Sequence, residues 1–337
     1  MEQFFKLFLL LGLIGILTFH SGCGGDSTAP DDEPKKPSKT VSIPRFEKDS
    51  AFRFVEKQVA FGPRVPNSEA HRKCKEWLVR QFKSSGARVV EQDFQAKAYT
   101  GKMLNGTNII AQFQPGRKKR ILLAAHWDSR HIADSPLSTE RRDEPILGAD
   151  DGGSGVAVLL EVGRQLQENP IEMGVDIILF DAEDYGQSND DQAAQESWCL
   201  GSQYWARNLH QKGYRPKYGI LLDMVGAKGA RFGKGQVSMN YAPRVMNKTW
   251  KLARNMGYGN YFVDVRSNGV TDDHYFVNTI AKIPMIDIIN KPLKTETGFG
   301  SHWHTHNDNM KVIDKRTLRA VGQVMLAVTY REANGTF

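Results

Sequence analysis

Short apolar runs alternate with amphipathic stretches along most of the chain, and this alternation predicts the secondary structure. Continuous or period-two apolar runs are typical of strands, whereas apolar residues spaced by three and four are typical of helices. The pattern therefore predicts a mostly parallel twisted central sheet flanked by helices, an α/β fold. The predicted strands are 88–94, 107–113, 121–125, 175–180, 218–222 and 284–289. The predicted helices are 52–60, 70–84, 202–211, 245–256, 315–333 and one capped by Ser154 after an Asp-Gly-Gly turn.

The N-terminal residues predict an export signal and a tether. Lys6 precedes an apolar run, 7–19, which is too short to span a bilayer and has the length of a signal-peptide core. Small residues lie directly before Cys23, as in bacterial lipoprotein signals. We predict a signal peptide at 1–22, lipidation of Cys23, and a periplasmic protein anchored to a membrane; an ordinary secretory signal with a chance cysteine is the alternative. Residues 23–42 have the polar, Pro-rich composition of a flexible tether.

The remaining residues, 43–337, are long enough for a single catalytic domain with a substantial core. The formal charge of +7 is spread thinly, without a stripe of Lys and Arg interleaved with aromatics, so we expect no nucleic-acid partner. We expect a monomer. Besides Cys23, only Cys74 and Cys199 are present, and an exported protein could pair them in a disulfide or leave them free.

Two adjacent carboxylates, Glu183 and Asp184, follow the apolar run at 175–180. Such a pair at the end of a buried strand can divide the chemistry, because one acid can ligate a metal while the other moves protons. In a parallel sheet, ligands bind outside the carboxyl ends of the strands, so residues that follow other strands should converge there. His and carboxylates are the ligands of catalytic zinc. The residues expected to converge with the pair are His126, Asp151, Asp223 and His304.

The order of these motifs resembles the zinc-dependent aminopeptidase superfamily, and the similarity covers nearly everything from 46 to 333. Within that superfamily, three features resemble the glutaminyl-peptide cyclotransferases of animals and their bacterial counterparts. They are Leu222-Asp223-Met224-Val225-Gly226-Ala227, Asp272-Asp273-His274, and Trp303 directly before His304. The aminopeptidases usually lack that tryptophan. The resemblance implies the zinc-exopeptidase fold, a phosphorylase/hydrolase-like α/β sandwich.

The resemblance also implies roles for individual residues. It implies that one zinc ion is held by Asp151, Asp184 and His304, with water or substrate in the fourth position. It implies that Glu183 transfers protons and that Asp223 and Asp272 assist it. It also implies that Trp303 forms a wall of the substrate pocket. The animal enzymes carry Glu where this chain has Asp184, but both acids supply the same oxygen donors.

Several further residues are candidates with two interpretations. Trp198 and Trp127 flank motif residues, and packing is favoured for both, although Trp198 is kept as a candidate for the substrate pocket. Asp287 lies within a predicted buried strand, so it needs partners and is either a hydrogen-bonding residue behind the site or part of the pocket floor. His126 would bind a second metal in a two-zinc aminopeptidase, whereas the cyclotransferases keep its motif without that use. The polar stretch 185–195 could be a lid or an insertion.

Three functions compete. The first is cyclisation of N-terminal glutamine in peptides and proteins to pyroglutamate, with zinc polarising the γ-carbonyl and Glu183 shuttling the proton. The second is a two-zinc aminopeptidase, because the chain contains a complete two-metal ligand set: His126, Asp151, Asp184, Asp223 and His304. The third is a non-catalytic binding domain on a peptidase fold, which is disfavoured because no ligand or proton carrier is missing.

Overall fold

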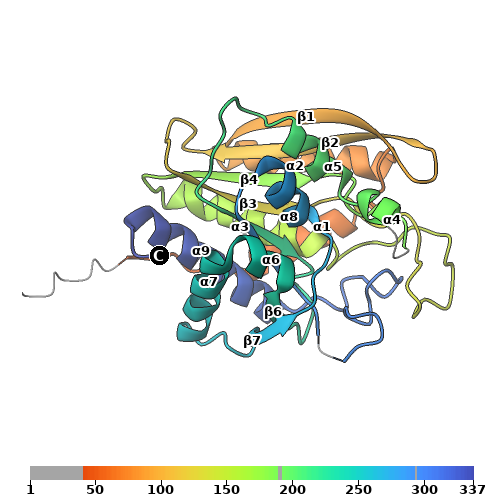
Figure 1. Ribbon diagram of the computed structural model, residues 1–337. Coiled ribbons are helices and arrows are strands. Elements are labelled where there is room, and N and C mark those ends of the chain that lie inside the picture. The colour runs from red at the N-terminus through yellow and green to blue at the C-terminus, as the bar shows by residue number, and fades with distance from the viewer. Residues whose placement is uncertain (1–40, 189–191, 293) are drawn as a thin grey trace, which may run out of the picture. The chain divides into compact units, whose positions relative to one another are not determined.

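The computed structural model describes residues 41–188, 192–292 and 294–337, and a six-stranded sheet lies at its centre (Figure 1). Across the sheet the order is β1 (Arg88–Lys97), β2 (Met103–Phe113), β4 (Gly174–Phe180), β3 (Arg120–His126), β5 (Gly219–Asp223) and β8 (Met285–Ile289). The last four run parallel, whereas β1 and β2 form an antiparallel pair beside β4. The prediction of a mostly parallel sheet is confirmed.

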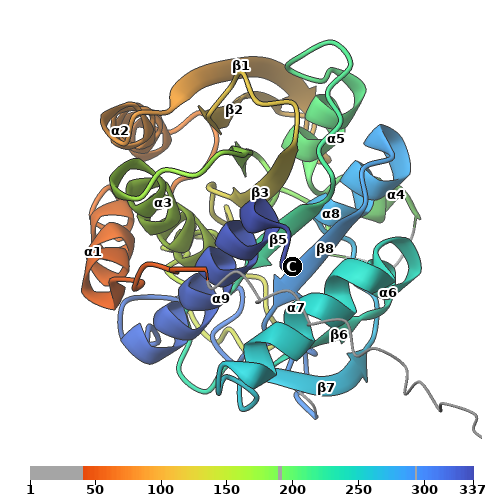
Figure 2. The same ribbon diagram turned by 90° about the vertical axis from the view of Figure 1, so that its left-hand side faces the viewer.

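Helices cover both faces of this sheet (Figure 2). One layer contains α1 (Lys48–Val59), α2 (Glu69–Ser84), α3 (Gly153–Glu168), α7 (Pro243–Asn255) and α9 (Lys315–Asn334). The other contains α5 (Leu200–Arg207), α8 (Asp273–Phe276) and the π-helical turn η1 (Val277–Ala281). Both layers are needed because the central strands are apolar on both faces, as parallel strands usually are.

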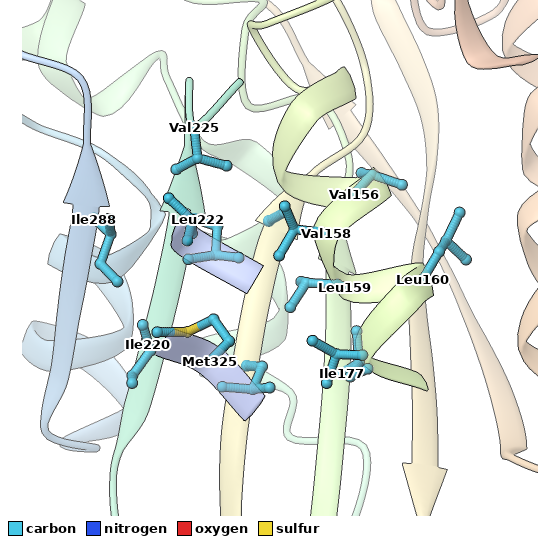
Figure 3. Packing of buried hydrophobic residues seen from close by; sticks show 14 of the residues in the cluster. Val156, Val158, Leu159, Leu160, Ile177, Ile220, Leu222, Val225, Ile288 and Met325 are labelled. Atoms are coloured by element: carbon cyan, nitrogen blue, oxygen red, sulfur yellow. The ribbon is translucent and has the colours of Figure 1, made fainter. Parts of the chain in front are cut away.

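Alternate side chains of β4 lie on opposite faces of the sheet and pack in two different hydrophobic cores. Ile177 and Leu179 pack in the core under α3 and α9, while Ile178 and Phe180 pack in the core under α5. Figure 3 shows the first core, where Leu159 of α3 and Met325 of α9 lie over the strands. Each fully buried side chain of this size stabilises the fold by about 1.5–3 kcal/mol.

The predicted helix after the Asp-Gly-Gly turn exists, but Ser154 is not its cap. The helix begins at Gly153, after Gly152 with a φ of 80°, which favours glycine. Ser154 lies in the first turn, where its hydroxyl donates to the Asp150 carbonyl at 2.6 Å and accepts from the Val225 amide at 2.9 Å. The hydroxyl therefore ties α3 to the loop after β5.

The short elements were not predicted. They are the parallel pair β6 (Phe232–Gly235) and β7 (Phe262–Ser267), and the helices α4 (Gln192–Glu196) and α6 (Gln236–Tyr241), together with α8 and η1. These runs of four to six residues are neither continuously apolar nor long enough to show helical periodicity, so the sequence does not identify them. Strand β1 also extends beyond the predicted 88–94, because pairing with β2 continues through its polar end to Lys97.

The predicted signal peptide, Cys23 and nearly all of the tether lie outside the described residues, and those expectations stay predictions. Among residues 41–188, 192–292 and 294–337, no helix is both long and apolar enough to cross a membrane. Cys74 and Cys199 are free, buried thiols, which settles the question of a disulfide between them.

Candidate active site and metal centre

The carboxyl ends of the parallel strands meet at one cavity of about 260 Å³, and six predicted site residues line it. They are Asp151, Glu183, Asp184, Asp223, Asp272 and His304, and both candidate pocket tryptophans, Trp198 and Trp303, line it too. Parallel β3, β4, β5 and β8 place their following loops at the same edge, which is why residues so distant in sequence converge. The cavity is also lined by residues that were not predicted as site residues: Gln195, Met224, Val270, Thr271, Ile289 and Phe299.

Asp151, Asp184 and His304 form the predicted ligand group. Their ligand atoms lie within 4.8 Å of one another, and all three residues are buried. His304 Nε2 is 3.0 Å from an Asp184 oxygen and 3.7 Å from an Asp151 oxygen. The other oxygen, Asp184 Oδ2, is buried without a hydrogen-bond partner among the described residues. Two carboxylates and one imidazole with an unsatisfied oxygen fit a zinc ion with an open fourth position.

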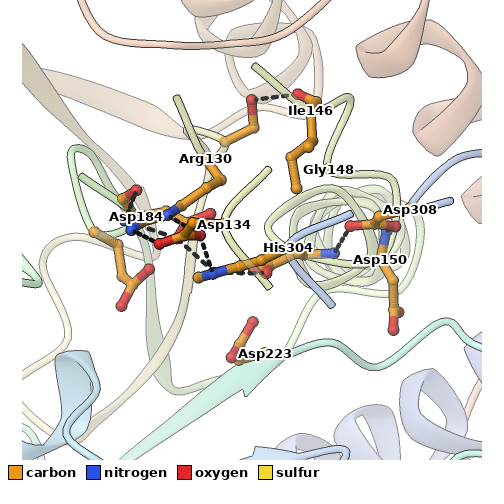
Figure 4. A network of polar contacts seen from close by, with 12 residues as sticks. Arg130, Asp134, Ile146, Gly148, Asp150, Asp184, Asp223, His304 and Asp308 are labelled. Carbon is orange, nitrogen blue, oxygen red and sulfur yellow. Dashed lines mark hydrogen bonds and ion pairs between the residues drawn. The ribbon is translucent and has the colours of Figure 1, made fainter. Parts of the chain in front are cut away.

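An ion pair between the buried Arg130 and the half-buried Asp134 orients His304 from behind (Figure 4). Asp134 accepts a hydrogen bond from His304 Nδ1 at 3.1 Å and pairs with Arg130 at 2.6 Å. Burial alone would raise the pKa of Asp134, but the hydrogen bonds from His304 and Arg130 outweigh it and hold the pKa well below its usual range. Arg130 also donates to the Asp184 carbonyl at 2.9 Å. Carboxylates in this position fix the tautomer and orientation of a metal-binding histidine; sequence reasoning did not identify Arg130 or Asp134.

The loop that carries Asp151 is held by a second carboxylate. Asp308 accepts the amides of Asp150 and Asp151, one at each oxygen, at 2.7 and 3.0 Å (Figure 4). Asp150 in turn is 2.9 Å from His302 and accepts the Gly226 amide at 2.7 Å. These contacts fix the backbone at Asp151, so the position of its carboxylate does not depend on the metal alone.

Glu183 is placed as a proton carrier would be. Asp128 accepts the amides of Glu183 and Asp184 at 3.1 and 3.0 Å, which fixes the turn after β4. Burial raises the pKa of Glu183 well above its ordinary value, and Asp184 and Asp272 add to this although His126 opposes it. A carboxyl group with a raised pKa can both accept and return a proton near neutral pH. The thiol of Cys199 donates to one Glu183 oxygen at 3.2 Å.

His126 joins a second group with Asp151 and Asp223. Its Nε2 lies 3.1 Å from Asp151 and 3.2 Å from Asp223. The ligand atoms of these three residues also lie within 4.8 Å of one another. The two oxygens of Asp151 therefore face different groups, Oδ1 toward His126 and Oδ2 toward His304. This is the arrangement of a carboxylate that bridges two metal ions, and it is equally that of a hydrogen-bonded imidazole beside one metal.

Asp272 and Asp287 form the floor beneath these groups. Asp272 lines the cavity and caps α8, and burial followed by the charge of Asp223 raises its pKa to about 7. Asp287 lies behind it in β8, and the carboxyl of Asp272 is the hydrogen-bond partner of its side chain, so one of these two acids must hold a proton. Burial and the charge of Asp272 raise the pKa of Asp287 well above its ordinary value. Asp287 therefore lies next to the acids of the site but does not line the cavity itself.

Aromatic rings form one wall. Trp303 is half-buried and stacks on His304, with ring centroids 3.8 Å apart, and on Phe299 at 4.7 Å. Trp198 also stacks on His304, with ring centroids 5.9 Å apart, and the Arg130 guanidinium lies over its ring at 4.5 Å. Trp127 is fully buried against His71, as the packing interpretation predicted. For Trp198 the packing interpretation was incomplete, because this ring also lines the cavity.

The stretch 185–195 is only partly described, since residues 189–191 lie outside the described ranges. Tyr185 is buried against His131, with ring centroids 3.8 Å apart, so this part is packed. Gln195 belongs to α4 and lines the cavity. The stretch therefore contributes to the wall of the site at its C-terminal end.

The comparisons with known proteins agree with this geometry. A solved Zn-dependent exopeptidase from Parabacteroides distasonis is 48% identical, with a TM-score of 0.83, and the match covers 86% of this chain and 99% of that one. A solved glutaminyl cyclase from Bacteroides thetaiotaomicron, bound to N-acetylhistamine, gives the same identity, TM-score and coverage. The Drosophila melanogaster glutaminyl-peptide cyclotransferase is 25% identical over 284 residues, which cover 76% of this chain and 73% of that protein.

These similarities confirm the resemblance to glutaminyl cyclases and to zinc exopeptidases that the sequence motifs indicated. The family model for peptidase family M28 matches residues 108–329, which include β3, the zinc ligand candidates and most of α9. On this match and on the geometry of its ligand groups, the chain belongs to peptidase family M28.

Proposed function

We propose that this protein is a glutaminyl-peptide cyclotransferase, which converts N-terminal glutamine of peptides and proteins to pyroglutamate. The observation that carries the proposal is the wall of the cavity. Trp303 stacks on His304, a candidate zinc ligand, and lines a cavity of only about 260 Å³. Pockets for drug-sized ligands are usually larger, about 300–1,000 Å³. This cavity suits one folded side chain with its own α-amine, which is the reacting unit of a cyclisation.

The reaction joins the α-amine nitrogen of glutamine to its γ-carbonyl carbon and expels the amide nitrogen as ammonia. Asp151, Asp184 and His304 would hold a zinc ion, which would supply a Lewis acid for the γ-carbonyl oxygen. Glu183 takes a proton from the attacking amine and returns it to the departing nitrogen. Asp223 and Asp272, which line the same cavity, share a proton with Glu183 or hold ammonium as it leaves. The Trp303 indole holds the side chain folded back on its amine, which supplies proximity.

We propose one zinc ion per chain, and the two ligand groups support this differently. In the group of Asp151, Asp184 and His304, Asp184 Oδ2 is buried without a partner among the described residues. In the group of His126, Asp151 and Asp223, the imidazole already contacts both carboxylates, at 3.1 and 3.2 Å. A buried unpaired oxygen costs about 1–3 kcal/mol, so the first group gains more from a cation than the second.

The second candidate function is a two-zinc aminopeptidase, and one observation favours it. His126, Asp151 and Asp223 are close enough to hold a metal ion, so the two-metal ligand set is geometrically complete. A non-catalytic binding domain is the weakest of the three, because every predicted ligand and proton carrier lies at the cavity or behind it.

We further propose that the protein is a periplasmic lipoprotein, anchored to a membrane through Cys23, and a monomer whose partners are exported peptides and proteins beginning with glutamine. The support is the apolar run at 7–19, the small residues before Cys23 and the polar stretch that follows. Globomycin treatment of an expressing bacterium should block processing and leave the precursor, whereas an ordinary secretory signal would still be cleaved.

The test of the activity uses matched peptides that begin with Gln or Leu. We expect ammonia release and a loss of about 17 Da, the mass of ammonia, from the Gln peptide only, with inhibition by a chelator and recovery with Zn²⁺. Release of free leucine would identify an aminopeptidase instead. Glu183→Gln should abolish turnover while the zinc content stays that of the wild type, and loss of zinc from this variant would refute the proton-carrier role.

A further inference from the structure

The edge of the central sheet opposite the cavity is strongly basic. Parallel β3 and β5 begin at this edge and end toward the cavity, which Asp223 of β5 lines. The loops before these strands are joined by a hydrogen bond from the Lys217 amide to the Arg120 carbonyl at 2.8 Å. Arg244 and Lys248 of α7 line a hollow together with Lys217. The exposed cations of the two loops are Arg117, Lys118, Lys119, Lys212, Arg215 and Lys217. We call these six side chains, with the two of α7, the basic edge.

The basic edge carries most of the net charge of the chain. Glu172 pairs with Arg117. The buried Glu332 pairs with Lys119 and Lys217, at 3.5 and 2.6 Å. No other acid among the described residues pairs with these eight cations. Eight basic side chains and two acidic ones leave a formal charge of +6, whereas the whole chain has +7. Because these residues are scattered from 117 to 332 in the sequence, only the fold gathers their charge.

Two hollows in the basic edge have different linings. One, of about 320 Å³, is lined by Lys118 and Arg215 among other cations, and no described acid lines it. The other, of about 330 Å³, is lined mainly by aromatic and aliphatic side chains, with three cations and Glu332 beside them. Tyr241 lines this second hollow and is 46% exposed. An exposed tyrosine beside Lys and Arg suits a membrane–water interface, where the ring enters the headgroup layer and the cations meet phosphates.

The chain enters the described part of the structure near this edge. The Phe46 amide and the Pro44 carbonyl are both hydrogen-bonded to the Gln323 side chain of α9, at 2.9 Å each. Gln323 lies roughly 14 Å along α9 from Glu332, the acid that pairs with the basic edge. Residues 24–40 can span at most about 60 Å. A lipid on Cys23 would therefore hold the basic edge within reach of the bilayer surface, at a high effective concentration.

We propose that the basic edge docks on an anionic phospholipid surface, that of the membrane to which Cys23 is proposed to anchor the chain. The cations pair with lipid phosphates, and Tyr241 lies among the headgroups. In Figure 1 the C-terminus, where Phe337 packs on Tyr218 of this edge, lies far from α4, whose Gln195 lines the cavity. The docked protein therefore presents its cavity away from the membrane. An acidic protein or a nucleic acid would match the charge, but the anchor would not hold it beside this edge. The proposal rests on the proposed anchoring and not on the proposed reaction.

The experiment measures co-sedimentation with vesicles of the chain that begins at residue 23 and carries Cys23→Ser, so that no lipid is attached. We expect binding to vesicles that contain phosphatidylglycerol with phosphatidylcholine, little binding to phosphatidylcholine alone, and a loss of binding as salt is raised. Lys118→Gln with Arg215→Gln removes two cations of the first hollow. Each should cost about fivefold in affinity, so this double variant should bind at least about tenfold more weakly. Lys118→Arg with Arg215→Lys keeps the charge and should bind as the wild type does.

The matched control is Lys102→Gln with Lys311→Gln, which removes two exposed cations outside the basic edge and should leave vesicle binding unchanged. Thermal unfolding checks that every variant is folded. Equal losses in the two Gln double variants would show that only net charge matters, and the proposal would be wrong. It would also be wrong if inorganic phosphate, polyglutamate or RNA binds while the vesicles do not. Because the measurement needs neither turnover nor the lipid, failure of the proposed reaction or of the lipidation would leave its outcome interpretable.

Discussion

Replacing Asp134 with asparagine should weaken zinc binding although Asp134 is not a ligand. Asp134 Oδ1 accepts from His304 Nδ1 and from Arg130 Nε, both at 3.1 Å, and Oδ2 accepts from a second Arg130 nitrogen and from Ser188, both at 2.6 Å. Asparagine has a single acceptor oxygen. Whichever way the amide is turned, its NH₂ group faces the guanidinium, and in one orientation it also faces the imidazole N–H, so at least one charge-assisted hydrogen bond is lost.

Such a hydrogen bond contributes about 1.5–3 kcal/mol. Partners behind a metal-binding histidine typically account for 10–100-fold in metal affinity, or about 1.4–2.8 kcal/mol, and the two ranges overlap. We therefore expect the dissociation constant for zinc to rise by about 10–100-fold in Asp134→Asn. The assay is competition with a fluorescent zinc chelator at constant pH.

The matched control is Asp264→Asn, which removes an exposed carboxylate paired with Lys234 and Arg254 on the small sheet. Its zinc affinity should equal that of the wild type. Thermal unfolding of each metal-free variant separates weaker zinc binding from a loss of the fold. An Asp134→Asn protein that is folded and binds zinc as tightly as the wild type would show that His304 is oriented by its stacking on the tryptophans alone.

Three further predictions concern the scaffold and the pocket. Gly155→Ala should lower the free energy of unfolding in urea by about 1–3 kcal/mol, because its Cβ would lie 2.3 Å from the Leu222 carbonyl oxygen. The control Gly116→Ala should not lower it, because a Cβ at that position meets nothing within 4 Å. Trp303→Leu should raise KM for the Gln peptide by about 5–10-fold at unchanged zinc content, because the stacked indole wall is lost, and Trp303→Phe should recover part of it. Burial lowers the pKa of His210, whose Nδ1 accepts from Trp205 at 3.1 Å. Below about pH 6.5, His210 therefore binds a proton in the unfolded chain but stays neutral in the folded chain. The difference in the free energy of unfolding between the wild type and His210→Asn should shrink as pH falls from about 7 to 5, by at most about 1.4 kcal/mol per pH unit.

The parts of the fold that were predictable from sequence are those with long periodic patterns. The six strands of the main sheet and the long helices α2, α3 and α9 repeat their apolar positions often enough to be recognised. The small sheet was not recognisable, because β7 contains Asp264 and Arg266 and is largely exposed. Its stability comes from tertiary packing. The ring centroids of Phe232 and Phe262 lie 5.3 Å apart, and the Phe262 ring packs edge-on against Trp250.

The residues of the site likewise fall into those that the sequence predicts and those that it does not. Residues that directly follow a strand, such as Glu183 and Asp223, were predictable because strand ends of a parallel sheet converge. Asp134 and Asp308 were not, because each lies in an irregular loop and acts through another residue's backbone or ring. Nothing in a single sequence distinguishes such acids from the solvated acids of ordinary loops.

One carboxylate decides how this scaffold divides its chemistry. Asp151 directs Oδ1 toward His126 and Oδ2 toward His304. On this scaffold, the two-metal site of an aminopeptidase and the one-metal site of a cyclase would therefore differ in whether a metal ion or a proton lies between His126, Asp151 and Asp223. A proton there keeps His126 a hydrogen-bond donor, and a metal ion there makes it a ligand. An aminopeptidase must activate a water molecule, for which a second metal ion is useful, whereas a cyclisation brings its own nucleophile as the α-amine. The proposed cyclisation, which needs no water, would therefore require only one zinc ion, with a proton between His126 and the two aspartates.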